Sequence, residues 1–446
     1  MAVEWETVPL DSLMEAGRGI SYGIVQPGAP VADGVPIVRV SDVRDGRVEV
    51  SAPLRVAPAI EAAYARTRLT GGELLLTLVG TVGEAAIAPA SLAGWNTARA
   101  VAVIPVRKEI GAYWVKLALQ APGVREIINS RLNTTVQATL NLGDVTQLPI
   151  VLPPIGERRA IAHILGTLDD KIELNRRMNE TLEAMARALF KSWFVDFDPV
   201  RAKAEGRDPG LPQPLADLFP DSFEDSELGE IPRGWEVAVL GELIDTVKGR
   251  SYKSEELVES DTALVTLKSF ARGGGYRPDG LKSFAGTYKA EQIVKPGELV
   301  IACTDVTQAA EVIGRPAIVR GMNGYRRLVA SLDTLIVRPR DSRMTLAFLY
   351  FLGGTEAFVA HTYAHTTGTT VLHLAKEAVP SFTFARPSTR LVEQFDALAG
   401  AALDRIQALE DESGMIAALR DTLLPKLISG ELRVKDAERF THRIAS

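Results

Sequence analysis

Three histidines in the C-terminal half come nearest, by type and spacing, to a metal site. His361 and His365 stand four positions apart, a spacing that places two side chains on one face of a helix, and His373 follows eight positions later. Imidazole nitrogens are common ligands of zinc, but a zinc site needs further ligands at a matching spacing. No such pattern accompanies the three histidines. A polar loop rich in Tyr and Thr explains them as well.

Nucleotide and group-transfer chemistry requires motifs that this sequence matches only in part. The segment 275–283 resembles a phosphate-binding loop, but one residue too many separates its second Gly from the Lys. The segment 198–200, Asp-Pro-Val, lacks the second Pro and the aromatic residue of an amino-methylation motif. Asp169, Asp170 and Glu173 are expected to form solvated ion pairs on an exposed helix face. We therefore predict no catalytic residue, no cofactor-binding residue and no metal ligand in this chain.

Polar residues beside predicted strands are the remaining candidates for a function. Arg and Lys suit guanine edges, Asn and Gln suit adenine edges, and Thr suits phosphates. In the first half the candidates are Arg39, Ser41, Thr81, Asn96, Arg99, Thr134, Thr135 and Gln137. In the second half they are Lys268, Ser269, Thr304, Thr307, Arg326, Arg327, Thr369 and Thr370. Singly, each suits an ordinary polar loop, but their recurrence at corresponding places in two halves predicts contacts with double-stranded DNA.

Bulk properties point to a cytoplasmic protein of several domains. A chain of 446 residues is too long for one core, and one cysteine excludes a disulfide framework. The N-terminus lacks the pattern of a signal peptide, and no apolar run approaches the roughly 20 residues of a membrane span. The net charge of −6 arises from residues 151–230, which hold 10 Lys+Arg against 16 Asp+Glu. The flanking parts are near neutral and could each present a basic face.

Two heptad frames require long helices to position these residues. Apolar or small side chains recur every seven residues in both frames, with one polar exception, Asn175. A seven-residue period predicts a helical seam that packs on another helix, and a polar seam residue commonly fixes the register. We expect the two helices to pack antiparallel. The seam positions are Ile161, Leu168, Asn175, Leu182 and Leu189 in the first frame, and Phe395, Ala402, Leu409, Ile416 and Leu423, each 234 positions later, in the second.

The segments before the two helices also repeat. Gly72-Glu-Leu-Leu-Leu76 is echoed by Gly297-Glu-Leu-Val-Ile301, and Thr134-Thr-Val136 by Thr369-Thr-Val371. The offsets drift around 234, so the frame is kept while loop lengths differ. β-branched runs broken by glycines, with a helical stretch near residues 112–129, predict an α+β module. Residues 196–232, rich in Pro, Gly, Asp and Glu, are expected to be extended and weakly structured, with Phe219 and Phe223 docking somewhere.

Long strings in the chain resemble the specificity (S) subunits of type I restriction–modification systems. Leu152-Pro-Pro-Ile-Gly-Glu-Arg-Arg-Ala-Ile161, the run Leu168–Asn175 and the run Leu182–Val200 are similar to the family's central region. Leu423-Leu-Pro-Lys-Leu-Ile-Ser-Gly-Glu-Leu432 is similar to its C-terminal signature. Two departures occur: Arg158 stands where the family often has Gln, and the second helix begins without the Pro-Pro motif.

The resemblance implies an α+β fold with two tandem target recognition domains of similar fold, separated by two long helices packed as an antiparallel coiled coil. The boundaries we predict are 1–152 for target recognition domain 1, 153–195 for the central coiled-coil helix, 196–232 for a linker, 233–386 for target recognition domain 2, 387–430 for the C-terminal coiled-coil helix and 431–446 for a tail.

The resemblance also implies a non-catalytic subunit that recognises a bipartite DNA site. The helices would dock two modification (methyltransferase) subunits, and two restriction subunits would complete the complex. S-adenosylmethionine, ATP and magnesium would belong to those partners, with no cofactor in this chain. Two alternatives stay open at this point. One is a specificity subunit of a related methylation or phage-defence complex without classical cleavage, and the other is a coiled-coil scaffold with no DNA role.

Overall fold

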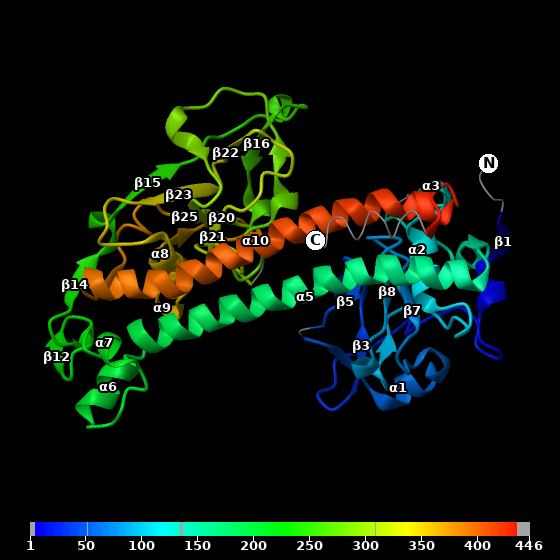
Figure 1. Ribbon diagram of the computed structural model, residues 1–446, viewed down its shortest axis with the longest axis horizontal. Coiled ribbons are helices and arrows are strands. Elements are labelled where there is room, and N and C mark those ends of the chain that lie inside the picture. Colours follow the sequence, from blue (N-terminus) through cyan, green and yellow to red (C-terminus); the bar gives the residue numbers. More distant parts are fainter. Residues whose placement is uncertain (1–4, 51, 134–136, 308, 435–446) are drawn as a thin grey trace. The chain divides into compact units, whose positions relative to one another are not determined.

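The computed structural model describes residues 5–50, 52–133, 137–307 and 309–434 (Figure 1). The chain folds into two compact units. Unit 1 contains the residues up to Glu173 and those from Ser413 on, and unit 2 contains Leu174–Glu412. Two 40-residue helices, α5 (Ile155–Phe194) and α10 (Thr389–Ile428), cross this boundary, so each unit holds one part of each helix. The two long helices that the heptads predict are thereby confirmed.

Module 1, the part of unit 1 that precedes α5, is built on short strands. They are β1 (Glu6–Pro9), β2 (Ser21–Tyr22), β3 (Val35–Val38), β4 (Val43–Arg44), β5 (Arg47–Val48), β6 (Leu54–Val56), β7 (Leu74–Thr77), β8 (Ala85–Ile87), β9 (Asn96–Thr97), β10 (Val101–Ile104) and β11 (Pro149–Leu152). One sheet is antiparallel in the order β2-β10-β7-β8. A second has the order β6-β3-β9, with β3 and β9 parallel, and β4 pairs with β5. The antiparallel pair β1 and β11 joins the two ends of the module.

Helix α2 provides the centre of the module 1 core. The helices of the module are α1 (Pro58–Ala62), α2 (Ala112–Gln120), α3 (Pro122–Ser130) and α4 (Leu142–Thr146). Trp114 of α2 is buried, and its indole Nε1 donates to the carbonyl oxygen of Val151 at 3.0 Å. The same core includes Ile161 of α5 and Leu423 of α10. Module 1 therefore packs on the parts of both long helices that lie in unit 1.

Module 2, residues 236–386 of unit 2, repeats this arrangement. Its strands are β14 (Glu236–Val239), β15 (Ile244–Lys248), β16 (Thr262–Val265), β17 (Lys282–Ser283), β18 (Ile293–Val294), β19 (Leu299–Ala302), β20 (Thr304–Asp305), β21 (Pro316–Ile318), β22 (Arg327–Ala330), β23 (Thr334–Pro339), β24 (Thr366–Thr367), β25 (Leu372–Leu374) and β26 (Thr383–Arg386). The sheets have the orders β15-β23-β19-β21, β17-β16-β22-β18 and β20-β25-β24, and β14 pairs with β26.

The two modules share one topology, which confirms the internal repeat. The order β15-β23-β19-β21 matches β2-β10-β7-β8 strand for strand, and the parallel pair β16 and β22 matches β3 and β9. The helices of module 2, α8 (Leu346–Gly353) and α9 (Glu356–Ala364), correspond to α2 and α3. Helix α3 begins at residue 122 and α9 at 356, and α5 begins at 155 and α10 at 389. Both pairs are 234 positions apart, so the spacing of the helices is the same in the two halves while the loops differ.

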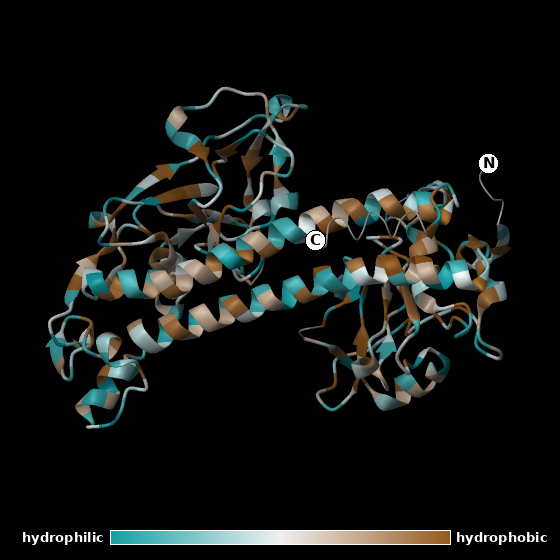
Figure 2. Cartoon of the chain, viewed as in Figure 1, coloured by the Kyte–Doolittle hydropathy of each residue, from teal (hydrophilic) through white to brown (hydrophobic). Residues whose placement is uncertain are grey.

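The seam residues of α5 and α10 face each other, as the heptads predict. In unit 2, Asn175 is 1% exposed, and its side-chain amide donates to the carboxylate of Glu412 at 2.8 Å and to the carbonyl oxygen of Leu409 at 3.4 Å. Further along, the rings of Phe190 and Phe395 lie 5.4 Å apart. Because 175 meets 409 while 190 meets 395, the helices run antiparallel. Figure 2 shows polar and apolar residues alternating along both helices. Among the described residues, no helix has the length and apolar character of a membrane span.

The segment 196–232 is folded, so the prediction of a weakly structured linker is wrong. It forms the helices α6 (Asp198–Ala204) and α7 (Gln213–Ala216) and the hairpin of β12 (Phe223–Ser226) with β13 (Gly229–Pro232). Phe219 is buried at 2% exposure, with its ring 5.3 Å from that of Trp193 in α5. The expected docking of Phe219 is confirmed, and the aromatic end of α5 supplies the surface that orders the segment.

Candidate nucleic-acid interface

In module 1 the carboxyl ends of β3 and β9 bring together two predicted DNA-contacting segments. The strands pair with Val38 opposite Thr97, and the amide of Ala98 donates to the carbonyl oxygen of Val38 at 2.8 Å. Arg39 and Ser41 follow β3 and Arg99 follows β9, with Ser41 and Arg99 exposed. The Arg39 guanidinium lies 3.2 Å from the Asp42 carboxylate, which balances its charge.

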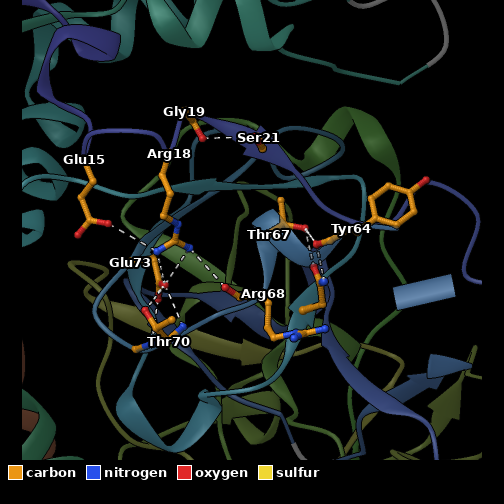
Figure 3. A network of polar contacts seen from close by, with 11 residues as sticks. Glu15, Arg18, Gly19, Ser21, Tyr64, Thr67, Arg68, Thr70 and Glu73 are labelled. Atoms are coloured by element: carbon orange, nitrogen blue, oxygen red, sulfur yellow. Dashed lines mark hydrogen bonds and ion pairs between the residues drawn. The ribbon is translucent and has the colours of Figure 1, made fainter. Parts of the chain in front are cut away.

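Asn96, the fourth candidate at this end of the sheet, lies in the interior. Its amide nitrogen donates to Glu61 at 3.0 Å, and its oxygen accepts from the Thr67 hydroxyl at 2.8 Å. Arg68 pairs with Glu61, and this bond outweighs burial and holds the pKa of the Glu61 carboxyl below its usual value. Figure 3 shows Thr67 and Arg68 of this network. Asn96 is 0% exposed and so cannot face DNA, which corrects the prediction: it is a structural residue.

The repeated Gly-Glu strings have a structural role beside this network. Glu73 accepts from the Arg18 guanidinium at 3.2 Å and from the backbone amide of Thr70 at 2.9 Å, as Figure 3 shows. Glu298, its counterpart in module 2, accepts from the amide of Lys295 at 2.7 Å and from Arg338 at 2.6 Å. In each module a carboxylate closes the turn before the central strand, β7 or β19.

A second surface of module 1 is formed by loop pair 1, residues 79–83 with residues 137–139. The amide of Gly80 donates to the carbonyl oxygen of Ala138 at 3.0 Å, and Val79 bridges to Thr139. This pairing brings the exposed side chains of Thr81 and Gln137 to one surface from two distant parts of the sequence. Thr134 and Thr135, predicted to belong here, lie outside the described residues.

Module 2 forms the corresponding loop pair 2, residues 304–307 with residues 366–374. Strand β25 pairs with β20, with Thr304 opposite His373, and with β24. This register brings Thr307 alongside the turn that carries Thr369 and Thr370, both exposed. Thr304 itself is only 7% exposed and is therefore a structural residue of the strand pair, which corrects its predicted role.

Asp305 holds the base of loop pair 2. Its carboxylate accepts from the backbone amides of Val312 at 2.6 Å and Ile313 at 2.9 Å, and from the amide of Thr307. Burial opposes the ionisation of this carboxyl group, but these hydrogen bonds outweigh burial and hold its pKa below the usual value. One buried carboxylate thus holds the backbone amides of Thr307, Val312 and Ile313, which fixes the position of Thr307.

The remaining candidates of module 2 do not form one surface. Lys268 is exposed just after β16, whereas Ser269 is 0% exposed and its hydroxyl accepts from the amide of Thr266 at 3.2 Å. Ser269 is therefore also corrected to a structural residue. Arg326 and Arg327 are exposed at the start of β22. Because β16 and β22 are parallel, these arginines lie at the strand end opposite to Lys268.

The histidines of module 2 make contacts among themselves and with the backbone. The rings of His361 and His365 lie 4.3 Å apart, and Nδ1 of His365 lies 2.8 Å from the carbonyl oxygen of His361. Within the described ranges, no group of three or more His, Cys, Asp or Glu side chains is placed to hold a metal ion.

Two acidic residues of α5 hold module 1 on the helices, which corrects their interpretation as solvated pairs along one helix. The Asp169 carboxylate accepts from Arg420 of α10 at 2.9 Å and from the Tyr113 hydroxyl of α2 at 2.8 Å. Burial opposes its ionisation, but Arg420 and the other partners outweigh burial and lower the pKa of Asp169. Glu173 pairs with Arg47 of module 1 at 2.9 Å. Asp169 directly follows the seam residue Leu168, and this flanking position is the signal that could have indicated a contact between elements.

Comparison with known proteins identifies the class of this fold. Residues 2–184 match the family described as type I restriction modification DNA specificity domain. The chain is 24% identical to the type I restriction enzyme HindI specificity subunit of Haemophilus influenzae over 69% of its own length and 73% of that protein. It is 24% identical to the type I restriction enzyme MjaIX specificity subunit of Methanocaldococcus jannaschii, over 82% and 78% of the two chains. The crystal structure of a type I S subunit from M. genitalium, 14% identical, has the same fold with a TM-score of 0.52 over 95% of this chain and 96% of that one.

The fold and these matches define a DNA-specificity protein made of two repeated modules and two long antiparallel helices. Residues 2–184 match the type I restriction modification DNA specificity domain, and relatives that match most of the chain are specificity subunits of type I restriction enzymes. The resemblance drawn from its sequence strings, and the fold class that it implied, are both confirmed.

Proposed function

We propose that this chain selects the DNA target of a type I restriction–modification complex, with residues 1–152 and 233–386 each reading one half of a bipartite site. One observation carries the proposal: two modules of the same topology each present a loop pair, and the two loop pairs differ in sequence and length. Two modules with the same strands and helices but different loops are suited to recognising two different half-sites. Apart from Val306, the exposed side chains of both loop pairs are polar, which suits base edges and phosphates.

The partners follow from the same proposal. We infer that the antiparallel helices dock two modification subunits, which methylate DNA, and that two restriction subunits join them. Catalysis would then belong to the partners, together with S-adenosylmethionine, ATP and magnesium, and this chain would be non-catalytic with no cofactor of its own. The names of its relatives as specificity subunits favour this division of labour. We place the complex in the cytoplasm, where the DNA that it would modify is found.

Genome-wide adenine methylation tests the proposal. The methylome is read by single-molecule sequencing in the host strain, in a strain lacking this gene, and in that strain with the gene restored. The expected result is a motif of two short defined halves around an unspecified spacer, present in the first and third strains and absent from the second. A methylome that is the same in all three strains would overturn the proposal.

A further inference from the structure

A cavity of about 450 Å³ opens in module 2 between the loop that precedes β21 and helix α9. The residues that matter for its chemistry are Arg315, Glu356, Val359 and Tyr363. Two of the lining segments lie close in sequence to loop pair 2, because Ala309 is two positions after Thr307 and Tyr363 is three positions before Thr366. The cavity therefore lies next to the surface that we propose to face DNA.

Arg315 lines this cavity without an ion-pair partner among the described residues. Its Nε is buried and makes no hydrogen bond, and none of the described residues forms an ion pair with its guanidinium. Burial lowers the pKa of Arg315, and the nearby positive charge of Arg187 lowers it further. The Arg187 guanidinium lies beside Gly354, another residue of the cavity wall, and its charge is shared with Glu183 at 2.9 Å. A half-buried cation beside a second cation is costly unless an anion joins it.

Module 1 has an internal ion pair at the corresponding place. Glu84 directly precedes β8, and its carboxylate lies 3.8 Å from the guanidinium of Arg125 in α3. In module 2 the residue that directly precedes the matching strand, β21, is Arg315. The counterpart of Arg125, 234 positions later in α9, is Val359. Module 2 thus has the cation Arg315 at the position of the anion Glu84. It has the apolar side chain of Val359 at the position of the cation Arg125.

We propose that the cavity at Arg315 binds a backbone phosphate of the DNA, an anchor that module 1 does not have. This inference rests on the proposed function. Arginine suits a phosphate because its guanidinium donates two parallel hydrogen bonds to the oxygens. The other charged wall residue, Glu356, is exposed at the first turn of α9, where its charge acts on Lys191. Tyr363, 53% exposed at the rim, offers a flat apolar face to the sugar beside the phosphate.

The test measures the binding of the complete methyltransferase complex to a duplex with its target, over a series of salt concentrations. Arg315→Gln should weaken binding roughly tenfold, because one charge-assisted contact is lost. The slope of log affinity against log salt should fall by about one, since one phosphate contact fewer releases one counterion fewer. The matched control is Arg343→Gln, because Arg343 is exposed in the same module and is already paired with Asp341 at 2.7 Å. This control should leave affinity and slope unchanged.

A second variant keeps Arg315 and gives its guanidinium an ion-pair partner within the protein. Val359→Glu would give Arg315 an internal partner, as Glu84 and Arg125 have in module 1, and should weaken DNA binding as much as Arg315→Gln does. Replacing single phosphates of the duplex by neutral methylphosphonates should reveal one position that weakens binding of the native complex and not of Arg315→Gln. Unchanged affinity and slope in both variants would overturn the inference, as would a loss of complex assembly in place of DNA binding. A native complex that binds no DNA would instead contradict the proposed function.

Discussion

Burial separates the polar residues that can meet DNA from those that hold the modules together. Asn96 and Gln137 are both amides in module 1, but Asn96 is fully buried between Glu61 and Thr67, whereas Gln137 is exposed on loop pair 1. A buried amide satisfied by internal hydrogen bonds contributes to stability, and an exposed one is available to a ligand. The same chemical type therefore takes two roles within one module.

Asn96→Ala and Gln137→Ala should consequently have opposite effects. Asn96→Ala removes the buried hydrogen bonds of the Asn96 amide to Glu61, to Thr67 and to the carbonyl oxygen of Tyr64, so it should lower the free energy of unfolding by about 2–3 kcal/mol. The methylated sequence should stay the same. Gln137→Ala should leave the denaturant midpoint unchanged and reduce methylation at the native site. An Asn96→Ala protein of full stability with an altered half-site would return Asn96 to the DNA-contacting residues.

The Asp169 cluster gives unit 1 a pH dependence. The carboxyl pKa is lower in the folded chain than the usual 3.8, so ionised Asp169 contributes stability above that pH, and the contribution is lost as the pH falls through the folded value. Asp169→Asn should cost about 1–2 kcal/mol at neutral pH, since the group is partly exposed. The difference from the native chain should shrink when urea denaturation is measured at decreasing pH down to about 3. Asp170→Asn, one position along on the exposed face, is the control and should cost little at any pH.

Among the elements, the segment 198–232 shows how a polar, proline-rich sequence becomes ordered by contact. Its own residues form only short helices and one hairpin. The end of α5 contributes Trp193 and Phe194 to a cluster that also buries Val200, Phe219 and Trp235. Lys203 adds a hydrogen bond to the carbonyl oxygen of Ala216 at 3.1 Å. The order of the segment thus depends on the aromatic surface beneath it.

Phe219→Ala should therefore release this segment. Removing a buried phenyl ring costs about 3–5 kcal/mol, and proteolysis should then cut within residues 205–222 while the modules stay intact. Phe223→Ala is the matched comparison, since Phe223 is only half-buried, and it should cost less and leave the segment resistant. Equal protease resistance of the native and Phe219→Ala chains would show that the aromatic contact does not order the segment.

For the whole molecule, the repeat predicts that the antiparallel helices act as a spacer between two readers. The helical frames are offset by the same 234 positions throughout, and the contact of Asn175 with Leu409 defines which heptads oppose each other. Residues 176–182 of α5 then oppose residues 402–408 of α10. Seven residues of helix span about 10 Å, which is close to three base pairs of DNA.

Deleting both of these heptads together should keep the seam in register and shorten the spacer of the target by about three base pairs. Both half-site sequences should remain as they are, because neither module is changed. The methylome of a strain carrying the double deletion provides the measurement. The control deletes only residues 176–182, which puts the seam out of register and should abolish methylation. A changed half-site in the double deletion would sink the spacer hypothesis.

The sequence by itself determined the long helices, their antiparallel seam, the two matched modules and the resemblance to specificity subunits. These features are local or repeated. A heptad pattern can be recognised within one stretch of sequence, and similar strings such as Gly72-Glu and Gly297-Glu show which parts of the two halves correspond. Only the tertiary structure decided which polar residues are interior, because the burial of Asn96, Thr304 and Ser269 depends on neighbours far away in the chain. The same reason explains the bond between Asp169 and Arg420, which are 251 positions apart. It also explains why Arg315 has no ion-pair partner among the described residues, because the facing residue of α9, Val359, is distant in the sequence and apolar. Periodicity is a property of residues near each other in the sequence, whereas burial and charge balance depend on residues that become neighbours only in the folded chain.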